Sequence, residues 1–344
     1  LSWQIHALNV ILSIVDRTSD NLRARGHFYV KEEILEKVFK SIDEQIEILI
    51  SRNIIIDDYE KAYKLLSKNN YYYLINGYKN VFIDCTEKEE RYLKGTKLEE
   101  IYALYKFDKD IKIIFLKYLL LIENEVDAFI AYEFSKKYGH KDYLIPINFC
   151  YLNFKSNYVK KFIKDVNLEI QYQYKNSNEM IVHYLDNYGY IPMWVLVRVL
   201  SFGKISKFYS LMKQQEQNSI SRKYNLRVKE FEMILHNLTL VRNICAHDEK
   251  LYDIKLKKRI SSNIYHKKLE IENKDGNYQL GTRDLFSISI IFKLLLEREE
   301  FNEFYTEVIN NIKVLSEKLF TVTIDKIIYK MGFPENYKEL LNIK

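Results

Sequence analysis

The sequence predicts a mostly α-helical protein, and two observations carry this prediction. The 344 residues include three prolines and nine glycines, too few for the many tight turns of a β-sandwich or barrel. Apolar residues also recur at helical spacing, most clearly over 98–138. With 47% apolar and 29% charged residues, the chain has the composition of a globular protein with ample material for a core. Its length fits either two domains or one elongated helical body.

Charge and cysteine content limit the classes of function. The net charge of +6 and the pI near 8.8 permit a nucleic-acid partner without requiring one. Cys85, Cys150 and Cys245 show neither a pairing pattern nor metal-ligand spacing, so a cytoplasmic location is expected. The apolar run 113–122 contains a lysine and is too short to span a bilayer. No glycine-rich phosphate loop or Cys/His cluster is present, so neither a nucleotide nor a metal cofactor is expected.

The N-terminal part is predicted to contain an extension, 1–40, with two helical patterns, followed by the main body of the chain from 41 to 344. A new helix is predicted to begin after Ser41, because Ser41 and Glu44 have the spacing of a capping box. It would end near 52–53, with Ile42, Ile46, Leu49 and Ile50 on one face.

A second helix is predicted over 58–67, and a cluster of tyrosines follows at 71–73. A tyrosine can bury its ring while its hydroxyl keeps a partner, so these aromatic side chains are predicted to pack in the core. Next, a short helix is predicted to end at Phe107–Asp108, and a long amphipathic helix would run from Asp108 until Gly139 closes it. Glu123 on this helix is interpreted as structural, pairing with a basic residue of the site helix predicted over about 229–247.

Residues 140–190 show little regular pattern. The pattern then sharpens at 191–203, where Pro192 is predicted to start a helix and Gly203 to stop it. Trp194 within it is interpreted as a core anchor, and a further helix is predicted over 205–212.

The segment whose side chains are best suited to catalysis lies at the end of a helix predicted over about 229–247. Its apolar stripe comprises Phe231, Ile234, Leu235, Leu238, Val241 and Cys245. Asn243 and His247 are four residues apart and share another face. Arg242 lies about 140° from His247 around an ideal helix. Arg242 and His247 can therefore contact one ligand only if the long arginine side chain reaches across, if the helix end is distorted, or if a second subunit supplies one of the two residues.

Arg242, Asn243 and His247 together suit phosphodiester cleavage without a metal. Histidine exchanges protons near neutral pH, and arginine stabilises charge on phosphorus-bound oxygens. The alternative is that the pattern arises by chance, since a histidine near a helix C-terminus also interacts favourably with the helix dipole.

The segment after the site helix, 251–281, is predicted to be a loop or small hairpin rich in basic residues. Such residues can contact phosphates, giving affinity that falls with salt; the alternative is a solvated loop. The candidate nucleic-acid contacts are Lys250, Lys257, Lys258, Arg259, Lys267 and Lys268, with Lys255 and His266 nearby. Two closing helices are predicted over 284–297 and 301–319.

Several short motifs, in the right order, resemble the Abi-like (AbiD/AbiF) abortive-infection proteins of the HEPN superfamily. The central one is Arg242-Asn243-Ile244-Cys245-Ala246-His247. The others are Asp43-Glu44-Gln45-Ile46 with Asp57, Asn70-Tyr71-Tyr72 with Gly77-Tyr78, Phe107-Asp108 with Ile122-Glu123, Pro192-Met193-Trp194 with Ser201-Phe202-Gly203, and Met331-Gly332-Phe333-Pro334-Glu335-Asn336. The likeness covers about 41–340.

This resemblance implies an all-α HEPN bundle and a metal-independent endoribonuclease of phage defence, with a site shared by a homodimer. Arg242, Asn243 and His247 would be catalytic, and RNA would be the substrate. The alternative is a non-catalytic protein that holds a cognate structured non-coding RNA. The chain departs from the family pattern in two places: Arg198 stands where an acidic residue is usual, and Asp248-Glu249-Lys250 stands where a basic or histidine-rich stretch usually follows the motif. Extra acid there is expected to weaken phosphate binding.

Overall fold

The structure is a computed structural model that describes residues 38–150 and 156–343. It confirms the all-α prediction, since the described chain is mostly helical with one short hairpin. The predicted helical patterns of the 1–40 extension lie almost entirely outside the described residues. Contacts divide the chain into two units, Leu1–Glu44 and Gln45–Lys344. Among the helices of the described ranges, none is both long and apolar enough to cross a membrane.

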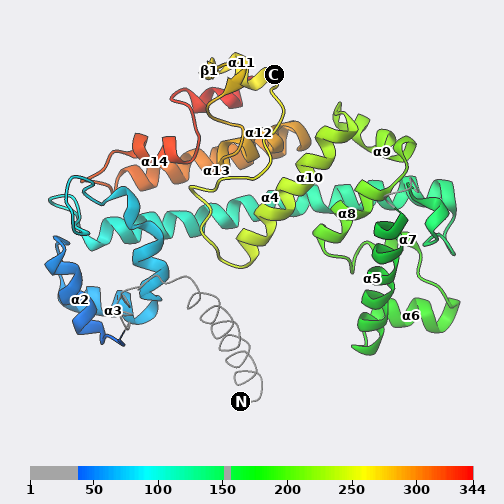
Figure 1. Cartoon of the computed structure of the whole chain (residues 1–344), viewed down its shortest axis with the longest axis horizontal. Helices are drawn as coiled ribbons and strands as arrows, with labels where there is room; N and C mark the ends of the chain where they lie inside the picture. Colours follow the sequence, from blue (N-terminus) through cyan, green and yellow to red (C-terminus); the bar gives the residue numbers. More distant parts are fainter. Residues whose placement is uncertain (1–37, 151–155, 344) are drawn as a thin grey trace, which may run out of the picture. The chain divides into compact units, whose positions relative to one another are not determined.

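The regular elements follow one another along the chain as labelled in Figure 1. The helices are α2 (Ile42–Ser51), α3 (Tyr59–Lys68), α4 (Leu98–Tyr138), α5 (Ser156–Lys175), α6 (Glu179–Tyr188), α7 (Met193–Leu196), α8 (Phe202–Leu211), α9 (Gln214–Ser221), α10 (Val228–Ala246), α11 (Ile264–Lys268), α12 (Leu285–Leu295), α13 (Arg298–Ser316) and α14 (Ile324–Lys330). The strands β1 (Asn273–Lys274) and β2 (Asn277–Tyr278) form the hairpin that the sequence allowed within 251–281.

The capping box predicted at the start of α2 is confirmed. The Ser41 hydroxyl accepts the N–H of Glu44 at 3.2 Å, and the Glu44 carboxylate accepts the N–H of Ser41 at 2.8 Å. Ile46 and Leu49 are buried as predicted, but Ile50 is half exposed. The apolar face of α2 is therefore narrower than predicted.

The predicted packing of the tyrosine cluster is wrong for two of its members. Tyr72 and Tyr73 are 68% and 59% exposed and contact each other edge to face. They belong to a short π-helical turn, Tyr72–Asn76, whose buried residues are Leu74 and Ile75. The aliphatic residues of this turn thus take the core positions, and the two tyrosine rings stay at the surface.

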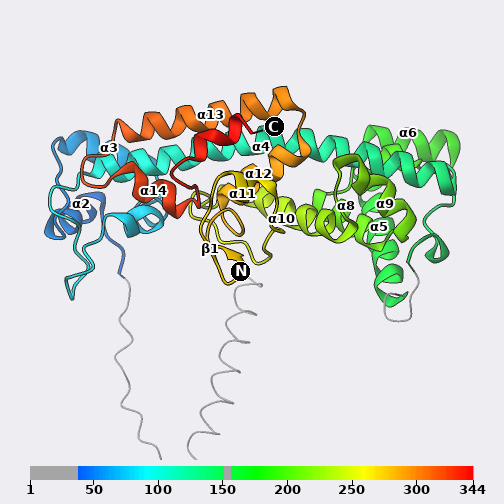
Figure 2. The same ribbon diagram turned by 90° about the horizontal axis from the view of Figure 1, so that it is seen from above.

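Helix α4 is the element on which the C-terminal part of the chain packs. It is a single helix of 41 residues, roughly 60 Å long, and it contacts α7, α9, α10, α12 and α13. Figures 1 and 2 show α13 running alongside it. The predicted break at Phe107–Asp108 is wrong, because Asp108 is fully buried within the helix and its carboxylate is used in a tertiary contact. Gly139 ends the helix as predicted, at φ +81°.

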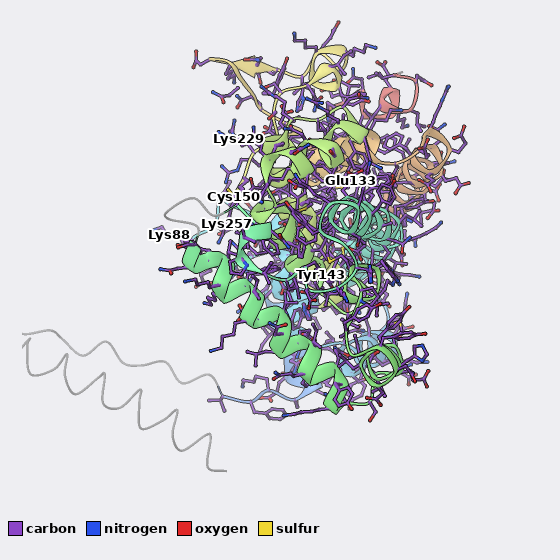
Figure 3. The ribbon with its side chains drawn as sticks, turned by 90° about the vertical axis from the view of Figure 1, so that its right-hand side faces the viewer. Lys88, Glu133, Tyr143, Cys150, Lys229 and Lys257 are labelled. Atoms are coloured by element: carbon purple, nitrogen blue, oxygen red, sulfur yellow. The ribbon has the colours of Figure 1, made fainter. Side chains whose placement is uncertain are left out.

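Regular helices occupy much of the region where the sequence showed little pattern. Helix α5 buries Val159, Phe162 and Val166, which are spaced at three and four residues. Its other positions are largely Lys, Tyr, Asn and Gln, so the apolar stripe is thin. In Figure 3, α5 is the long green helix.

The segment predicted as one helix over 191–203 consists of two pieces. Pro192 precedes the one-turn helix α7, and Ser201 caps the next helix, α8, by accepting the N–H of Lys204 at 3.4 Å. Gly203 therefore lies inside α8 and does not stop a helix. A methyl group at Gly203 would lie 3.4 Å from the Thr239 side chain, in ordinary van der Waals contact, so α8 and α10 are close neighbours at this position.

Trp194 is not the core anchor that the sequence suggested. The single turn of α7 buries Met193, Val195 and Leu196 and leaves Trp194 51% exposed. A helix of one turn cannot bury residues around its whole circumference, and here the larger ring is the one left outside.

The closing helices α12 and α13 are confirmed, and α14 follows them. At the C-terminal motif, Gly332 has φ +82°, and a Cβ there would lie 2.0 Å from the Asp284 carboxyl carbon. Asp284 caps α12 by accepting the N–H of Ser287 at 3.0 Å. Gly332 is thus required both by its backbone conformation and by the close approach of the α12 cap.

Candidate active site at the end of helix α10

Helix α10 carries the proposed catalytic residues because its apolar stripe fixes its orientation. Phe231, Ile234, Leu235, Leu238 and Val241 are buried, and Cys245 is partly buried. The helix packs on α4, α8 and α9. The positions of Asn243 and His247 consequently face away from the core, and both residues are exposed.

The end of α10 has a defined geometry that places His247 at its C-cap. The His247 N–H donates to the Asn243 carbonyl at 2.9 Å, and the Glu249 N–H donates to the Ile244 carbonyl at 3.0 Å. Between them, Asp248 takes a left-handed conformation, φ +56°, at the position where glycine most often ends a helix. His247 is therefore held by the terminal turn of the helix.

Arg242 points to a different neighbour from Asn243 and His247. Its Nε lies 3.7 Å from Oε2 of Glu123 on α4, and 34% of its side chain remains exposed. The two groups form an ion pair without a hydrogen bond, because neither atom has a hydrogen-bond partner among the described residues. Burial raises the pKa of Glu123, and Arg242 opposes that rise. The predicted pairing of Glu123 with a basic residue of the site helix is confirmed.

The chain that follows His247 is fixed by the buried Asp108. Its carboxylate accepts the N–H of Tyr252 at 2.6 Å, the N–H of Leu251 at 3.1 Å and the hydroxyl of Tyr78 at 2.6 Å. Burial raises the pKa of Asp108 although these donors and Lys112 oppose the rise. Asp108 thus ties the segment beyond the motif to α4.

Two lysines of α4 hold the acidic residue that directly follows His247. Lys112 bonds Oδ1 of Asp248, and Lys109 lies 3.4 Å from Oδ2. Lys112 also lies 3.5 Å from Asp108. Burial works to raise the pKa of Asp248, but the two lysines outweigh it and keep the pKa below its ordinary value. Asp248 is therefore ionised but paired, which reduces the repulsion of phosphate expected from the sequence.

Lys112 and Lys109 were missed by sequence reasoning, although a signal existed. Lys112 stands four residues after Asp108, the spacing of an ion pair on one helix face. It interrupts an otherwise apolar stripe, and its side chain is only 5% exposed. A lysine at a core position four residues from an aspartate indicates a buried charge network.

The six basic candidates do not form one cluster with the end of α10. Lys257, Lys258 and Arg259 are exposed, and Lys257 is labelled in Figure 3. Burial, together with the charges of Lys258 and Lys257, lowers the pKa of His236 on α10, so these lysines lie near the middle of that helix. His236 precedes Asn243 by about two turns, roughly 10 Å.

The remaining basic candidates have other surroundings. Lys250 pairs with Asp253 at 2.8 Å. Lys267 and Lys268 are on α11, which Figure 1 shows far from the C-terminal end of α10. His266, expected in the basic patch, is fully buried, stacks on Tyr278 and bonds the Gly281 carbonyl at 2.9 Å. Its ring supports the hairpin, so the expectation that it belongs to the exposed patch is wrong.

Cys245 and the acidic residues provide no obvious second chemistry at the site. Burial raises the pKa of the Cys245 thiol to about 12, which keeps it protonated and unreactive at neutral pH. Within 38–150 and 156–343, no three His, Cys, Asp or Glu residues form a group that could hold a metal ion.

Comparison with known proteins assigns the chain to a family. The model of the family described as Abi-like protein matches residues 64–253, which is more than half of the 344 residues. The matched range contains Tyr78, Asp108, Glu123 and the whole of α10 with His247. No curated protein and no solved structure matches the chain.

Proposed function

The chain belongs to the Abi-like protein family, and on that premise we propose that it is a metal-independent endoribonuclease of a phage-defence system. RNA is the substrate, and Arg242, Asn243 and His247 form the catalytic group. The observation that carries the proposal is the end of α10, where the capped terminal turn exposes Asn243 and His247 together while Glu123 holds Arg242 on the adjoining side.

The chemistry assigned to each residue follows from its side chain. In RNA cleavage the 2′-hydroxyl oxygen bonds to phosphorus while the bond to the 5′-oxygen breaks. This leaves a cyclic phosphate and a 5′-hydroxyl. His247 exchanges a proton with one of these oxygens, and Arg242 stabilises charge on the non-bridging oxygens. Asn243, on the face of His247, donates a hydrogen bond to the phosphate or orients the imidazole.

The direction of Arg242 supports a site shared by two subunits. Within one chain, Arg242 is drawn toward α4, and Asn243 and His247 face solvent. A second copy of the chain, related by twofold symmetry, can bring its own α10 end to this surface. His247 of one subunit would then meet the phosphate that Arg242 of the other subunit binds.

Two substitutions test the catalytic assignment. Arg242→Ala and His247→Ala should each abolish RNA cleavage and cell toxicity while the circular dichroism spectrum of the folded protein is retained. His247 is exposed, so its loss should leave thermal unfolding unchanged, whereas Arg242→Ala removes the ion-pair partner of Glu123 and should lower the unfolding temperature without unfolding the protein. The matched controls are Arg227→Ala and His183→Ala, which remove the same residue types from exposed positions at the N-cap of α10 and on α6. Cleavage is assayed with purified protein in EDTA. Equal cleavage by the wild type and both site variants would refute the proposal.

A non-catalytic RNA-binding function is the second candidate, and one observation favours it. Lys257, Lys258 and Arg259 are exposed, and the two lysines lie beside the middle of α10, so these side chains can contact phosphates without any role for His247. This function predicts RNA binding that weakens steeply with salt, survives His247→Ala, and yields no cleaved product. Sequencing the RNA that co-purifies with wild type and with His247→Ala distinguishes the two candidates.

A further inference from the structure

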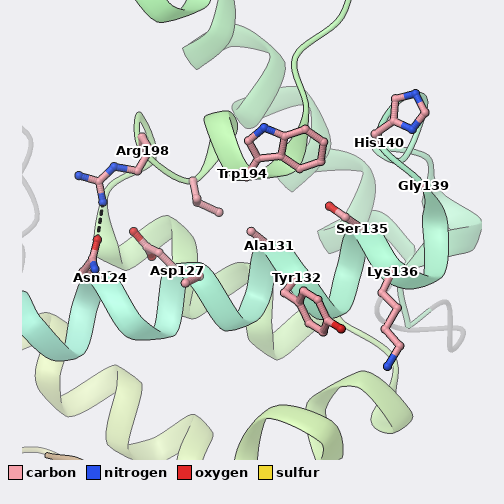
Figure 4. Close-up of a pocket in the computed structure, with 12 residues that line it drawn as sticks. Asn124, Asp127, Ala131, Tyr132, Ser135, Lys136, Gly139, His140, Trp194 and Arg198 are labelled. Atoms are coloured by element: carbon pink, nitrogen blue, oxygen red, sulfur yellow. Dashed lines mark hydrogen bonds between the residues drawn. The ribbon is translucent and has the colours of Figure 1, made fainter.

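A pocket of about 610 Å³ lies between α4 and the segment that contains α7 (Figure 4). Its volume is within the range of sites that bind small organic ligands. The lining residues are Asn124, Asp127, Ala128, Ala131, Tyr132, Ser135, Lys136, Gly139, His140, Trp194, Val197 and Arg198. The proposed catalytic group takes no residue from this set.

Trp194 forms one wall of the pocket. Its ring is half exposed and lies over the stretch of α4 that carries Ala131 and Ser135 (Figure 4). Ala128, Ala131 and Ser135 have small side chains spaced at three and four residues, so the α4 side of the pocket stays open beneath the indole. A space between an exposed indole and a helix lined with small residues suits a flat aromatic ring.

Asp127 supplies a polar group that the protein itself leaves without a partner. The residue is 6% exposed, and no hydrogen-bond partner for its Oδ1 is found within the described part of the chain. In Figure 4 the side chain rises from α4 toward the pocket. A buried carboxyl oxygen without a donor is unfavourable, so a ligand that brings an N–H group would remove this cost.

Basic side chains line both ends of the pocket. Arg198 donates to Asn124 at 2.8 Å at one end, and Lys136 and His140 lie at the other. A nucleotide combines the two features that this arrangement can recognise, a flat base with N–H donors and a phosphate. Arg198 adds a positive charge at the end nearer the proposed active site, within electrostatic reach of Glu123.

The pocket adjoins the proposed active site through α4. Glu123 and Asp127 are four residues apart, about 6 Å along the helix, and Glu123 pairs with Arg242. Electrostatic interaction between the two carboxyls helps to raise the pKa of Asp127, although burial is the main cause. A nucleotide in the pocket would therefore lie beside the scissile group bound at Arg242.

We propose that this pocket binds a nucleobase of the RNA substrate, stacked on Trp194 and hydrogen-bonded to Asp127. The base that fits a carboxylate acceptor is guanine, whose ring N–H and exocyclic amine lie side by side. Adenine, cytosine and uracil do not offer this pair of adjacent donors. The assignment of RNA as the source of the base rests on the proposed function, and the site would set which nucleotide flanks the cut.

Nucleotide binding is tested first, independently of cleavage. The chain has two tryptophans, so Trp3→Phe leaves Trp194 as the single tryptophan fluorophore. We expect GMP to quench its fluorescence and to bind more tightly than UMP, with affinities measured by equilibrium dialysis. Trp194→Ala should weaken GMP binding about tenfold, as expected for loss of one stacking partner, while Trp194→Phe should keep most of it. Asp127→Asn should remove the preference for GMP over AMP.

Cleavage mapping on a mixed-sequence RNA supplies the second readout. Wild type should show a preferred guanine at one position beside the cut, and Trp194→Ala and Asp127→Asn should lose it. Tyr158→Ala removes a comparably exposed aromatic ring from α5 and should preserve it. Each variant is checked for a cooperative thermal unfolding transition.

Three outcomes overturn the inference. In the first, wild type cleaves RNA, but GMP does not quench Trp194 fluorescence and the variants keep the wild-type nucleotide preference beside the cut. That outcome leaves the proposed function intact. The second is quenching that UMP produces as strongly as GMP. The third is conversion of a dimer to a monomer by Trp194→Ala in sedimentation experiments, which would make the pocket a subunit contact. Quenching by GMP without any RNA cleavage would instead contradict the proposed function alone.

Discussion

Asp108 of α4 accepts the backbone N–H of Tyr252 at 2.6 Å across 144 positions of sequence. The contact holds the segment that leaves the end of α10, five residues beyond His247. Because the same carboxylate also faces Tyr78 and Lys112, one buried group links the start of the family match, the long helix and the proposed active site.

Asp108→Ala should strongly destabilise the protein. It leaves the two buried backbone N–H groups of Leu251 and Tyr252 without an acceptor, and the nearly buried Lys112 keeps only Asp248 as a carboxylate partner. Removing one partner of a buried charge network typically costs about 3–5 kcal/mol, and urea unfolding followed by circular dichroism measures the loss. Asp110→Ala is the control, since it removes the same charge from α4 at a partly exposed position. Similar losses in the two variants would contradict the role given to Asp108.

Asp248→Asn should strengthen RNA binding. Asparagine tolerates the left-handed conformation at this position, while loss of the carboxylate leaves Lys112 and Lys109 with one fewer negative partner. The affinity for RNA should rise, and its salt dependence should steepen by about one phosphate contact. Glu133→Gln makes the same change of net charge about 30 Å away along α4 and should leave both quantities unchanged. A result in which both variants tighten binding equally would indicate a general charge effect.

Asp127→Asn should stabilise the protein increasingly as pH rises. Burial, with a contribution from Glu123 and opposition from Arg198, raises the pKa of Asp127 to about 7. Because the folded pKa exceeds the unfolded value, the folded state binds the additional proton between about pH 4 and pH 7. Wild-type stability from this group is thus highest at low pH and is lost as pH rises through 7.

Asparagine does not titrate, so the difference in free energy of unfolding between Asp127→Asn and wild type should widen from pH 5 to pH 8 by a few kcal/mol, in order of magnitude. Chemical denaturation at a series of pH values measures it. Other buried carboxyls, such as Asp284, titrate in both proteins and cancel in the difference. A difference that stays constant with pH would show that Asp127 is already ionised at pH 5.

The sequence predicted the site helix well because its residues obey local rules. The apolar stripe of α10 and the capping box of Ser41 and Glu44 depend on positions only three or four residues apart, and both are confirmed. The ion pair between Glu123 and the site helix could also be predicted, because Glu123 is an acidic residue on an otherwise apolar helix face.

Two of the failures have a different cause, since they depend on partners distant in sequence. In the sequence, Asp108 is typical of the end of a helix; in the structure it lies inside α4, where the N–H groups of Leu251 and Tyr252 donate to its carboxylate. His266 was predicted to belong to a basic patch, but in the structure it is buried against Tyr278 and bonds the Gly281 carbonyl. No local sequence pattern marks the partners of Asp108 and His266. The failure at Trp194 has a local cause, because α7 is a single turn that buries Met193, Val195 and Leu196 and leaves the indole outside.

The most direct test mixes two inactive variants. If the ends of two α10 helices build one RNA-cleaving site, Arg242→Ala in one subunit and His247→Ala in the other leave one composite site intact in each mixed dimer. Co-expressed and purified through different affinity tags, such mixed dimers should regain RNA cleavage in EDTA, while each variant alone stays inactive. Mixed dimers as inactive as the separate variants would contradict the account.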